Sequence, residues 1–247
     1  MARSGEAKSA GNDGHLTPRT IAILAGSLFI IADVAGVSSV LATDSILKAP
    51  DYLEKISANQ DQVMLGALLV LAMGFALALV PIVIYPVFRR FNKALAVGYV
   101  VFRGALETFT YIALAVSWLL LLTLSREYVK AGSPDGSYFE AMGALLTGAG
   151  DWVVNMTAIV FSIGAFMYCF VFYQSRLVPR WLSAWGLVGA VLYLAAPLTT
   201  MFGHASVFGF LVAPLAIQEI ALAIWLIVKG FDRTVIAYGP VEAKGTG

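Results

Sequence analysis

Charged residues are scarce in this chain, and the scarcity excludes an ordinary soluble domain. Only 13% of its 247 residues are charged and 60% are hydrophobic, with a mean hydropathy of +0.83. A soluble domain carries about 25% charged and 45–50% apolar residues. The composition therefore predicts an all-α, polytopic membrane protein whose first partner is the lipid bilayer.

Residues that form disulfides or bind metals are also few. The single cysteine, Cys169, lies inside an apolar run and has no second cysteine in the chain to pair with. The two histidines are His15, in a polar amino-terminal segment, and His204, in a short predicted loop. A haem, zinc or di-iron site would lack its usual ligands, so we expect no cofactor and no metal.

Several kinds of chemistry lack the residues that they require. No lysine lies in mid-membrane to form a retinal Schiff base, and no glycine-rich phosphate loop of the Walker type occurs. Ser27 has no intramembrane histidine to activate it as a nucleophile. The net charge of +1 and the absence of a dense basic cluster give no basis for nucleic-acid binding. We therefore expect that the protein is not an enzyme.

Six long hydrophobic runs determine the expected architecture. Each is long enough to cross a hydrocarbon core of about 30 Å as a helix. The polar segments outside them, 1–18 and 231–247, are expected to be tails, the first of them disordered. The prediction is a six-transmembrane-helix bundle over 19–230, with spans at about 20–42, 63–88, 94–124, 151–173, 181–202 and 207–228.

The connections between the spans are predicted from their turn residues. A short surface helix is expected after Pro50, between the first two spans. Residues 125–150 are expected to form a longer loop, with a turn at 133–136 and a short interfacial helix over 138–146. Residues 203–206 are so few that the fifth and sixth spans must be antiparallel neighbours.

Basic residues are distributed unequally between the two ends of the predicted bundle. Eleven lysines and arginines fall on the side that carries both termini and four on the other side. By the positive-inside rule, this asymmetry predicts that both termini are cytoplasmic.

The third span carries two full charges, Arg103 and Glu107. A charge at the centre of a spanning helix costs about 2.5–3.5 kcal/mol, so both side chains should turn away from lipid and find partners. Arg103 is ten residues from Lys93, at the end of its span, and Glu219 is ten residues from Lys229. Because ten residues of helix rise about 15 Å, Arg103 and Glu219 should lie at the same depth and pair.

Asp33 and Glu107 are also at matching depths, because each lies fourteen residues from the basic end of its span. Three carboxylates would then face one guanidinium. Carboxylates crowded in a low-dielectric site cannot all stay ionised, so at least one should hold a proton. The candidate ligand or proton site consists of Asp33, Arg103, Glu107, Tyr111, Asn155, Gln218 and Glu219.

Two interpretations of this polar cluster stay open. The first is a site for a small polar solute, an ion or a proton, because ionisable residues inside membranes commonly mark pathways. The second is a structural core that fixes helix packing, in which Arg103 and Glu107 bond each other at i and i+4. Under the second, the protein would be a non-transporting membrane sensor or interaction module. Neither the solute nor the oligomeric state follows from the sequence.

A set of short motifs resembles an uncharacterised prokaryotic membrane family. The motifs are Pro86-Val-Phe-Arg-Arg90, Phe102-Arg103 with Glu107, Ser175-Arg-Leu-Val-Pro-Arg-Trp181-Leu-Ser, and Glu219 with Trp225-Leu-Ile-Val-Lys-Gly230. They are similar to the domain of unknown function DUF4386, and the resemblance would cover nearly all of 21–230. It implies a small multi-pass protein of a bacterial or archaeal plasma membrane, and it supplies no catalytic residue.

Overall fold

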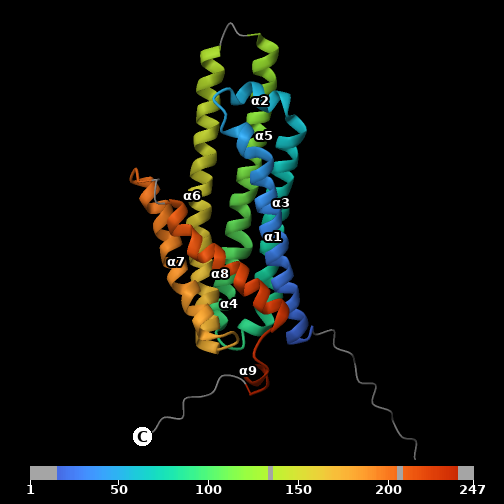
Figure 1. Cartoon of the computed structure of the whole chain (residues 1–247), viewed down its shortest axis with the longest axis vertical. Helices are drawn as coiled ribbons and strands as arrows, with labels where there is room; N and C mark the ends of the chain where they lie inside the picture. Colours follow the sequence, from blue (N-terminus) through green and yellow to red (C-terminus); the bar gives the residue numbers. More distant parts are fainter. Residues whose placement is uncertain (1–15, 133–135, 205–207, 239–247) are drawn as a thin grey trace, which may run out of the picture.

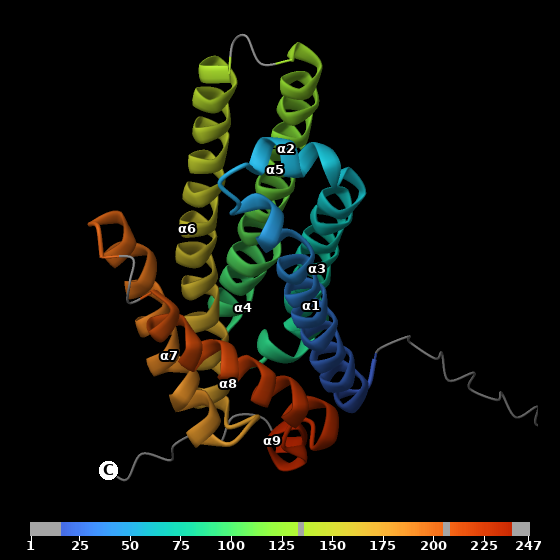
Figure 2. The same ribbon diagram turned by 45° about the horizontal axis from the view of Figure 1, so that its top comes forward.

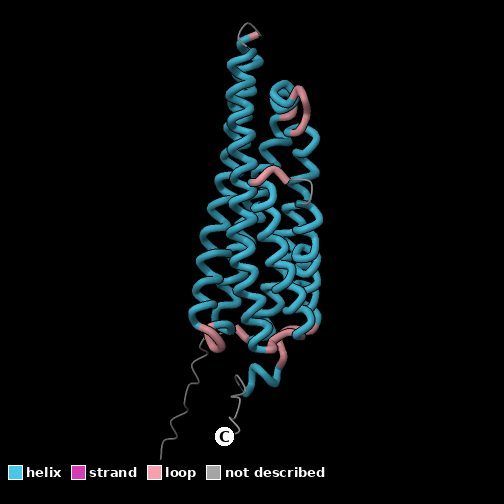
Figure 3. The backbone as a smooth tube through the Cα atoms, turned by 90° about the vertical axis from the view of Figure 1, so that its left-hand side faces the viewer, coloured by secondary structure: helices cyan, strands magenta, loops and turns pink. Residues whose placement is uncertain are grey.

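Helices make up almost all of the chain that the structure describes. The computed structural model describes residues 16–132, 136–204 and 208–238, and in those ranges it contains helices joined by short loops, with no strands (Figures 1 and 3). Six helical segments are long and apolar enough to cross a membrane. The elements are α1 (Pro18–Leu47), α2 (Tyr52–Ala58), α3 (Gln60–Phe88), α4 (Lys93–Tyr99), the π-helix η1 (Val100–Leu106), α5 (Glu107–Ala131), α6 (Gly136–Ser175), α7 (Arg180–Met201), α8 (Phe208–Val228) and α9 (Arg233–Tyr238).

The long helices pack as a ring in the order of the chain. α1 packs against α3, α3 against α5, α5 against α6, α6 against α7 and α7 against α8, and α8 closes the ring against α1 (Figure 2). The continuous segment α4–η1–α5 forms the third span. Each spanning helix therefore turns one side toward a shared interior. We call the end where α1 begins and α9 lies the terminal end, and the end that carries α2 the distal end (Figure 1).

The outside of this ring is apolar, as a surface that contacts lipid should be. Large aliphatic and aromatic side chains are exposed along every spanning segment, and Leu41 and Phe109 are 76% and 68% exposed. A soluble protein would not leave such an extended apolar surface in water. Other exposed examples include Val34, Leu68, Phe75, Val188 and Ile217.

Small residues let α8 approach its two neighbours closely. A Cβ atom on Gly26 of α1 would lie 2.6 Å from the Ala223 carbonyl oxygen of α8. A Cβ atom on Gly189 of α7 would lie 3.1 Å from the Cα atom of Leu215, also in α8. Close backbone approach at small residues is the usual way in which helices associate in membranes.

The terminal end is held together by contacts between the first and last helices. Arg19 donates through Nη2 to the carbonyl oxygens of Ile227 (2.6 Å) and Val228 (3.3 Å), and through Nη1 to that of Leu226 (3.3 Å). These carbonyls belong to the last turn of α8, where no intrahelical donor remains and a cation is favoured. Arg19 therefore caps α8 from a helix two hundred residues earlier in the chain.

Replacing this cap should loosen the terminal end. We expect Arg19→Met to destabilise the protein by about 1–2 kcal/mol, because three terminal carbonyls lose a charged donor. The midpoint of thermal unfolding of the detergent-solubilised protein would measure the change. Arg126→Met is a suitable control, since the Arg126 side chain makes a single, exposed hydrogen bond to Gln60 and the variant should leave the midpoint unchanged. Equal midpoints for both variants would contradict the capping role.

The carboxyl-terminal segment is more ordered than the predicted tail. Asp232 accepts hydrogen bonds from the Thr234 amide (2.8 Å) and hydroxyl (2.6 Å), which start α9 and lower the pKa of the Asp232 carboxyl. Phe231, Val235 and Ile236 pack against the main hydrophobic core. The expectation of a tail from residue 231 onward thus misses a helix, because six residues are too few to show a periodic pattern.

At the distal end the structure corrects the predicted loop over 125–150. α5 continues to Ala131, and α6 already begins at Gly136, so the two helices extend beyond the rest of the bundle (Figure 1). The proposed interfacial helix over 138–146 is the first part of α6, and the proposed turn at 133–136 falls mainly outside the described residues. The surface helix expected after Pro50 is present as α2, and the Ser125 hydroxyl of α5 donates to its Leu53 carbonyl.

Candidate functional site

A buried arginine lies at the centre of the ring. Arg103 and Glu107 are 1% and 0% exposed, and Glu219 is 8% exposed. The Arg103 Nη1 atom donates to both carboxylate oxygens of Glu107, at 3.2 and 3.1 Å, and Nη2 donates to Glu219 Oε1 at 2.8 Å. The guanidinium therefore joins the third span to the last one through charge-assisted hydrogen bonds.

Local backbone geometry places Arg103 in this position. It lies in the middle of η1, and it is the buried residue of that π-helix. A π-helix has i to i+5 hydrogen bonds, and such wide turns are rare and occur frequently at functional sites. Aromatic rings cover the guanidinium, whose Cζ atom is 4.4 Å from the ring centroid of Phe161 and 5.7 Å from that of Phe29. Cation–π contacts of this kind strengthen when water is excluded.

Two tyrosines support the carboxylates. The Tyr111 hydroxyl donates to Glu107 Oε1 at 3.0 Å. The Tyr168 hydroxyl lies 3.3 Å from both Glu219 Oε1 and Gln218 Oε1, and the Gln218 amide donates to the Leu182 carbonyl of α7 at 3.2 Å. The network thus connects α5, α6, α7 and α8 around the arginine.

A pocket of about 490 Å³ lies beside this network. We call it the charged pocket. It extends from the arginine toward the distal end, residues of all six spanning segments line it, and most of its wall is apolar. Asp33, Arg103 and Glu219 are the charged residues that line it, and Tyr111, Phe161, Tyr193 and Phe208 are the aromatic ones.

Some polar atoms at the site have no partner in the protein. Asp33 Oδ2, Arg103 Nε and the Tyr99 hydroxyl are each buried and make no hydrogen bond. Buried polar groups are almost always bonded, and each exception needs an explanation. Asp33 is half-buried and lines the charged pocket, so its free oxygen is available to a guest in that pocket.

The structure brings together most of the predicted site residues. Arg103, Glu107, Glu219, Tyr111 and Gln218 form one bonded network, and Asp33 lines the adjoining pocket without bonding the guanidinium. Asn155 does not join them. Its side-chain amide donates to the Asp151 carbonyl of its own helix at 2.9 Å, and it does not line the charged pocket.

Sequence reasoning missed four aromatic residues of the site: Tyr168, Phe29, Phe161 and Tyr193. Tyr168 is fully buried and bonds two predicted site residues, while Phe161 stacks edge-on against Tyr193 at 4.6 Å between centroids. In a chain with so many aromatic residues, composition did not separate these from lipid-facing ones. Matching depths, the rule that found Glu219, would not have selected Tyr168, because it lies only seven residues from the end of α6 at Ser175.

The fold and the site together define a multi-pass helical membrane protein with a charged pocket in its interior. Residues 24–230 match the family described as Domain of unknown function (DUF4386), and the chain belongs to this family. The chain is also similar to an uncharacterised protein of Archaeoglobus fulgidus, at 30% identity over 88 residues, which are 36% of this chain and 52% of that protein. The match thus spans about half the length of that relative. No solved structure matches the chain.

Proposed function

We propose that this protein binds a small polar solute or a proton in the charged pocket and carries it across the membrane. The observation that carries the proposal is the pocket itself, about 490 Å³ lined by Asp33, Arg103 and Glu219 inside the ring of spanning helices. Binding sites for small molecules are mostly apolar cavities of about 300–1,000 Å³ with a few well-placed polar groups. The charged pocket has this character.

A purely structural polar core is the rival explanation, and it accounts for less. Arg103, Glu107 and Glu219 form ion pairs with one another and could act as packing elements alone. A purely structural core does not require a carboxylate such as Asp33, which lines a pocket and has a buried oxygen without a hydrogen-bond partner. Leaving that oxygen unpaired costs about 1–3 kcal/mol, which a bound donor or a proton would recover.

The proposed setting is the plasma membrane of a bacterium or archaeon, with both termini in the cytoplasm. Arg89, Arg90, Arg176, Arg180 and Lys229 lie at the terminal end, whereas Lys48 and Lys55 lie at the distal end. Under the positive-inside rule this distribution supports a cytoplasmic terminal end, so that the charged pocket extends toward the outside.

Proton flux tests the proposal directly. In proteoliposomes that contain the full-length protein and the pH dye pyranine, an imposed membrane potential should drive proton entry above that of empty vesicles. We expect Glu219→Gln to reduce this flux at least tenfold, because the amide cannot exchange a proton. Glu127→Gln is the matched control, since Glu127 pairs with Lys130 on the surface and its flux should equal that of the wild type.

Two outcomes would contradict the proposal. Flux that is unchanged in Glu219→Gln would show that the cluster lies off the pathway. Absence of flux in the wild type, together with a lower unfolding midpoint in Glu219→Gln, would favour the structural core and hence the sensor or interaction module.

A further inference from the structure

We propose that the charged pocket takes a small amphiphilic amine, which reaches it through a second pocket at the distal end. This inference rests on the proposed function and specifies the chemical class of its ligand. Four observations carry it: a continuous route, a surplus of carboxylates along that route, a free acceptor at its inner end, and walls suited to an organic body.

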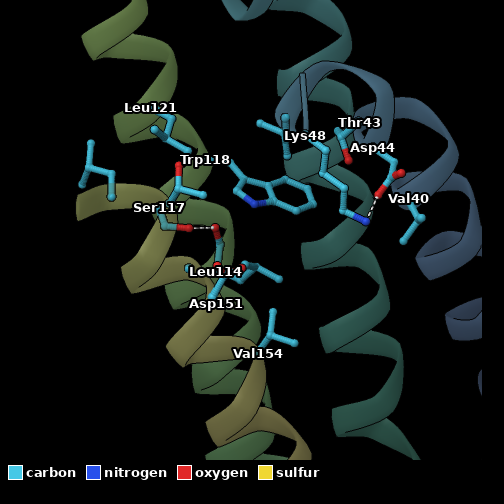
Figure 4. Close-up of a pocket in the computed structure, with 14 residues that line it drawn as sticks. Val40, Thr43, Asp44, Lys48, Leu114, Ser117, Trp118, Leu121, Asp151 and Val154 are labelled. Carbon is cyan, nitrogen blue, oxygen red and sulfur yellow. Dashed lines mark hydrogen bonds and ion pairs between the residues drawn. The ribbon is translucent and has the colours of Figure 1, made fainter. Parts of the chain in front are cut away.

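The route is formed by two adjoining pockets. A pocket of about 200 Å³, here called the distal pocket, lies between α1, α5 and α6 (Figure 4). Val40, Leu114 and Val154 line both the distal pocket and the charged pocket, so they form a shared apolar neck. In Figures 1 and 2, α1 and α6 lie on either side of α5.

Carboxylates outnumber cationic groups in each pocket. Asp44 and Asp151 line the distal pocket with Lys48, which forms an ion pair with Asp44 (Figure 4). Asp33 and Glu219 line the charged pocket with Arg103. Glu107 also bonds that guanidinium, so two carboxylates already pair with the single positive charge of Arg103. A low-dielectric cleft with an excess of negative charge attracts positive charge, so the surplus of carboxylates in both pockets favours a cation.

The unpaired oxygen of Asp33 favours a ligand that carries hydrogen-bond donors. Asp33 Oδ2 is buried without a hydrogen-bond partner and belongs to a residue of the pocket wall. An alkylammonium group has N–H donors and no acceptor, so it satisfies a carboxylate without repelling it. A carboxylate or phosphate guest would place another anion beside Asp33 and Glu219, and only the buried Nε of the Arg103 guanidinium is left without a partner.

The walls favour an organic cation over a bare metal ion. Among the described residues, no group of three or more His, Cys, Asp or Glu side chains could hold a metal ion. Divalent cations need about six oxygen ligands, and the charged pocket offers few oxygens. Its aliphatic lining, including Val37, Leu77 and Ala158, suits a hydrocarbon body, while Tyr111 and Tyr193 present aromatic rings to a cationic head.

Three probes with one hydrocarbon chain and different heads test the ligand class: hexylammonium, hexanoate and hexanol. Each is titrated calorimetrically into nanodiscs that hold the full-length protein, with empty nanodiscs subtracted. We expect saturable binding of hexylammonium that Asp33→Asn weakens at least tenfold, and no saturable binding of hexanoate. Asp51→Asn, which removes a surface carboxylate paired with Lys55, should bind hexylammonium like the wild type.

Either of two results would overturn the ligand class: hexanoate that binds as tightly as hexylammonium, or an Asp33→Asn affinity within twofold of the wild type. The outcome of this binding test is separable from the outcome of the proton-flux test of the proposed function. Proton flux that depends on Glu219, combined with tighter binding of hexanoate than of hexylammonium, would refute the amine as ligand and retain the carrier function. Hexylammonium binding that depends on Asp33 without any flux would retain the amine and refute the carrier.

The neck provides a second test that does not alter any charged residue. Val40→Trp should narrow the passage between the two pockets and slow hexylammonium association at least fivefold, measured by surface plasmon resonance on immobilised nanodiscs. Val34→Trp is the matched control, because Val34 lies on the same helix, is 61% exposed and does not line either pocket. Equal association rates for the two variants would overturn the route.

Discussion

Arg103→Met is expected to remove most of the stability of the protein. The substitution would leave Glu107 and Glu219 without their shared guanidinium in the interior of the bundle, where both are almost fully buried. Breaking a buried ion pair by removing one partner costs about 3–5 kcal/mol, and here one cation serves two carboxylates. Urea titration in mild detergent, followed by intrinsic tryptophan fluorescence, would measure the loss.

A compensated variant separates charge from packing in this experiment. Arg103→Met combined with Glu107→Gln and Glu219→Gln removes all three charges, and we expect it to recover a large part of the lost stability. Lys130→Met, which removes an exposed partner of Glu127, should unfold like the wild type. If Arg103→Met alone unfolded like the wild type, the two carboxylates would have to be neutral in the folded protein, and the guanidinium would not be their main partner.

Gly26→Leu is expected to have an effect of similar size through sterics alone. A Cβ atom at this position would lie 2.6 Å from the Ala223 carbonyl oxygen, 2.8 Å from Ile227 Cγ1 and 3.2 Å from Leu226 Cβ. Backbone atoms of α8 cannot move aside without opening the contact with α1. Overpacking typically costs about 1–3 kcal/mol and sometimes more, and a leucine at a helix crossing belongs to the upper part of that range.

The same change at Gly148 is the control for this prediction. Gly148 lies within α6, and a Cβ atom there would meet no atom within 4 Å. We expect Gly148→Leu to leave the unfolding midpoint unchanged or slightly raised, because leucine is the better helix former by about 0.8 kcal/mol. Similar midpoints for Gly26→Leu and Gly148→Leu would show that the crossing of α1 and α8 tolerates separation.

Hydropathy and residue counting predicted much of this structure. The six spanning segments follow from the length of the apolar runs, because a bilayer requires about twenty apolar residues for each crossing. The contact of Arg103 with Glu219, 116 residues apart, follows from equal distances to the ends of two spans. Depth is encoded in a membrane sequence because the rise per residue of a helix is fixed.

The rotation of each helix about its own axis is encoded less directly in the sequence than its depth is, and this explains why Asn155 was placed in the site. Asn155 has a suitable residue type, but its amide bonds its own helix and it lies outside the charged pocket. Counting along an ideal helix also misses η1, since the change of hydrogen-bond register at Val100–Leu106 has no signature in hydropathy. The extension of α5 and α6 was missed because residues 125–150 are polar, and polar helices that project from a membrane lack the apolar signal that marked the spans.

The ring order of the helices also bears on biogenesis. Most neighbours in the ring are neighbours in the chain, so each span can settle against the one synthesised just before it. The closure of α8 on α1 is the exception, and it brings Glu219 to Arg103 and Arg19 to the end of α8. A nascent chain that stops before α8 therefore retains only Glu107 as the partner of its arginine, and the site is completed when the sixth span inserts.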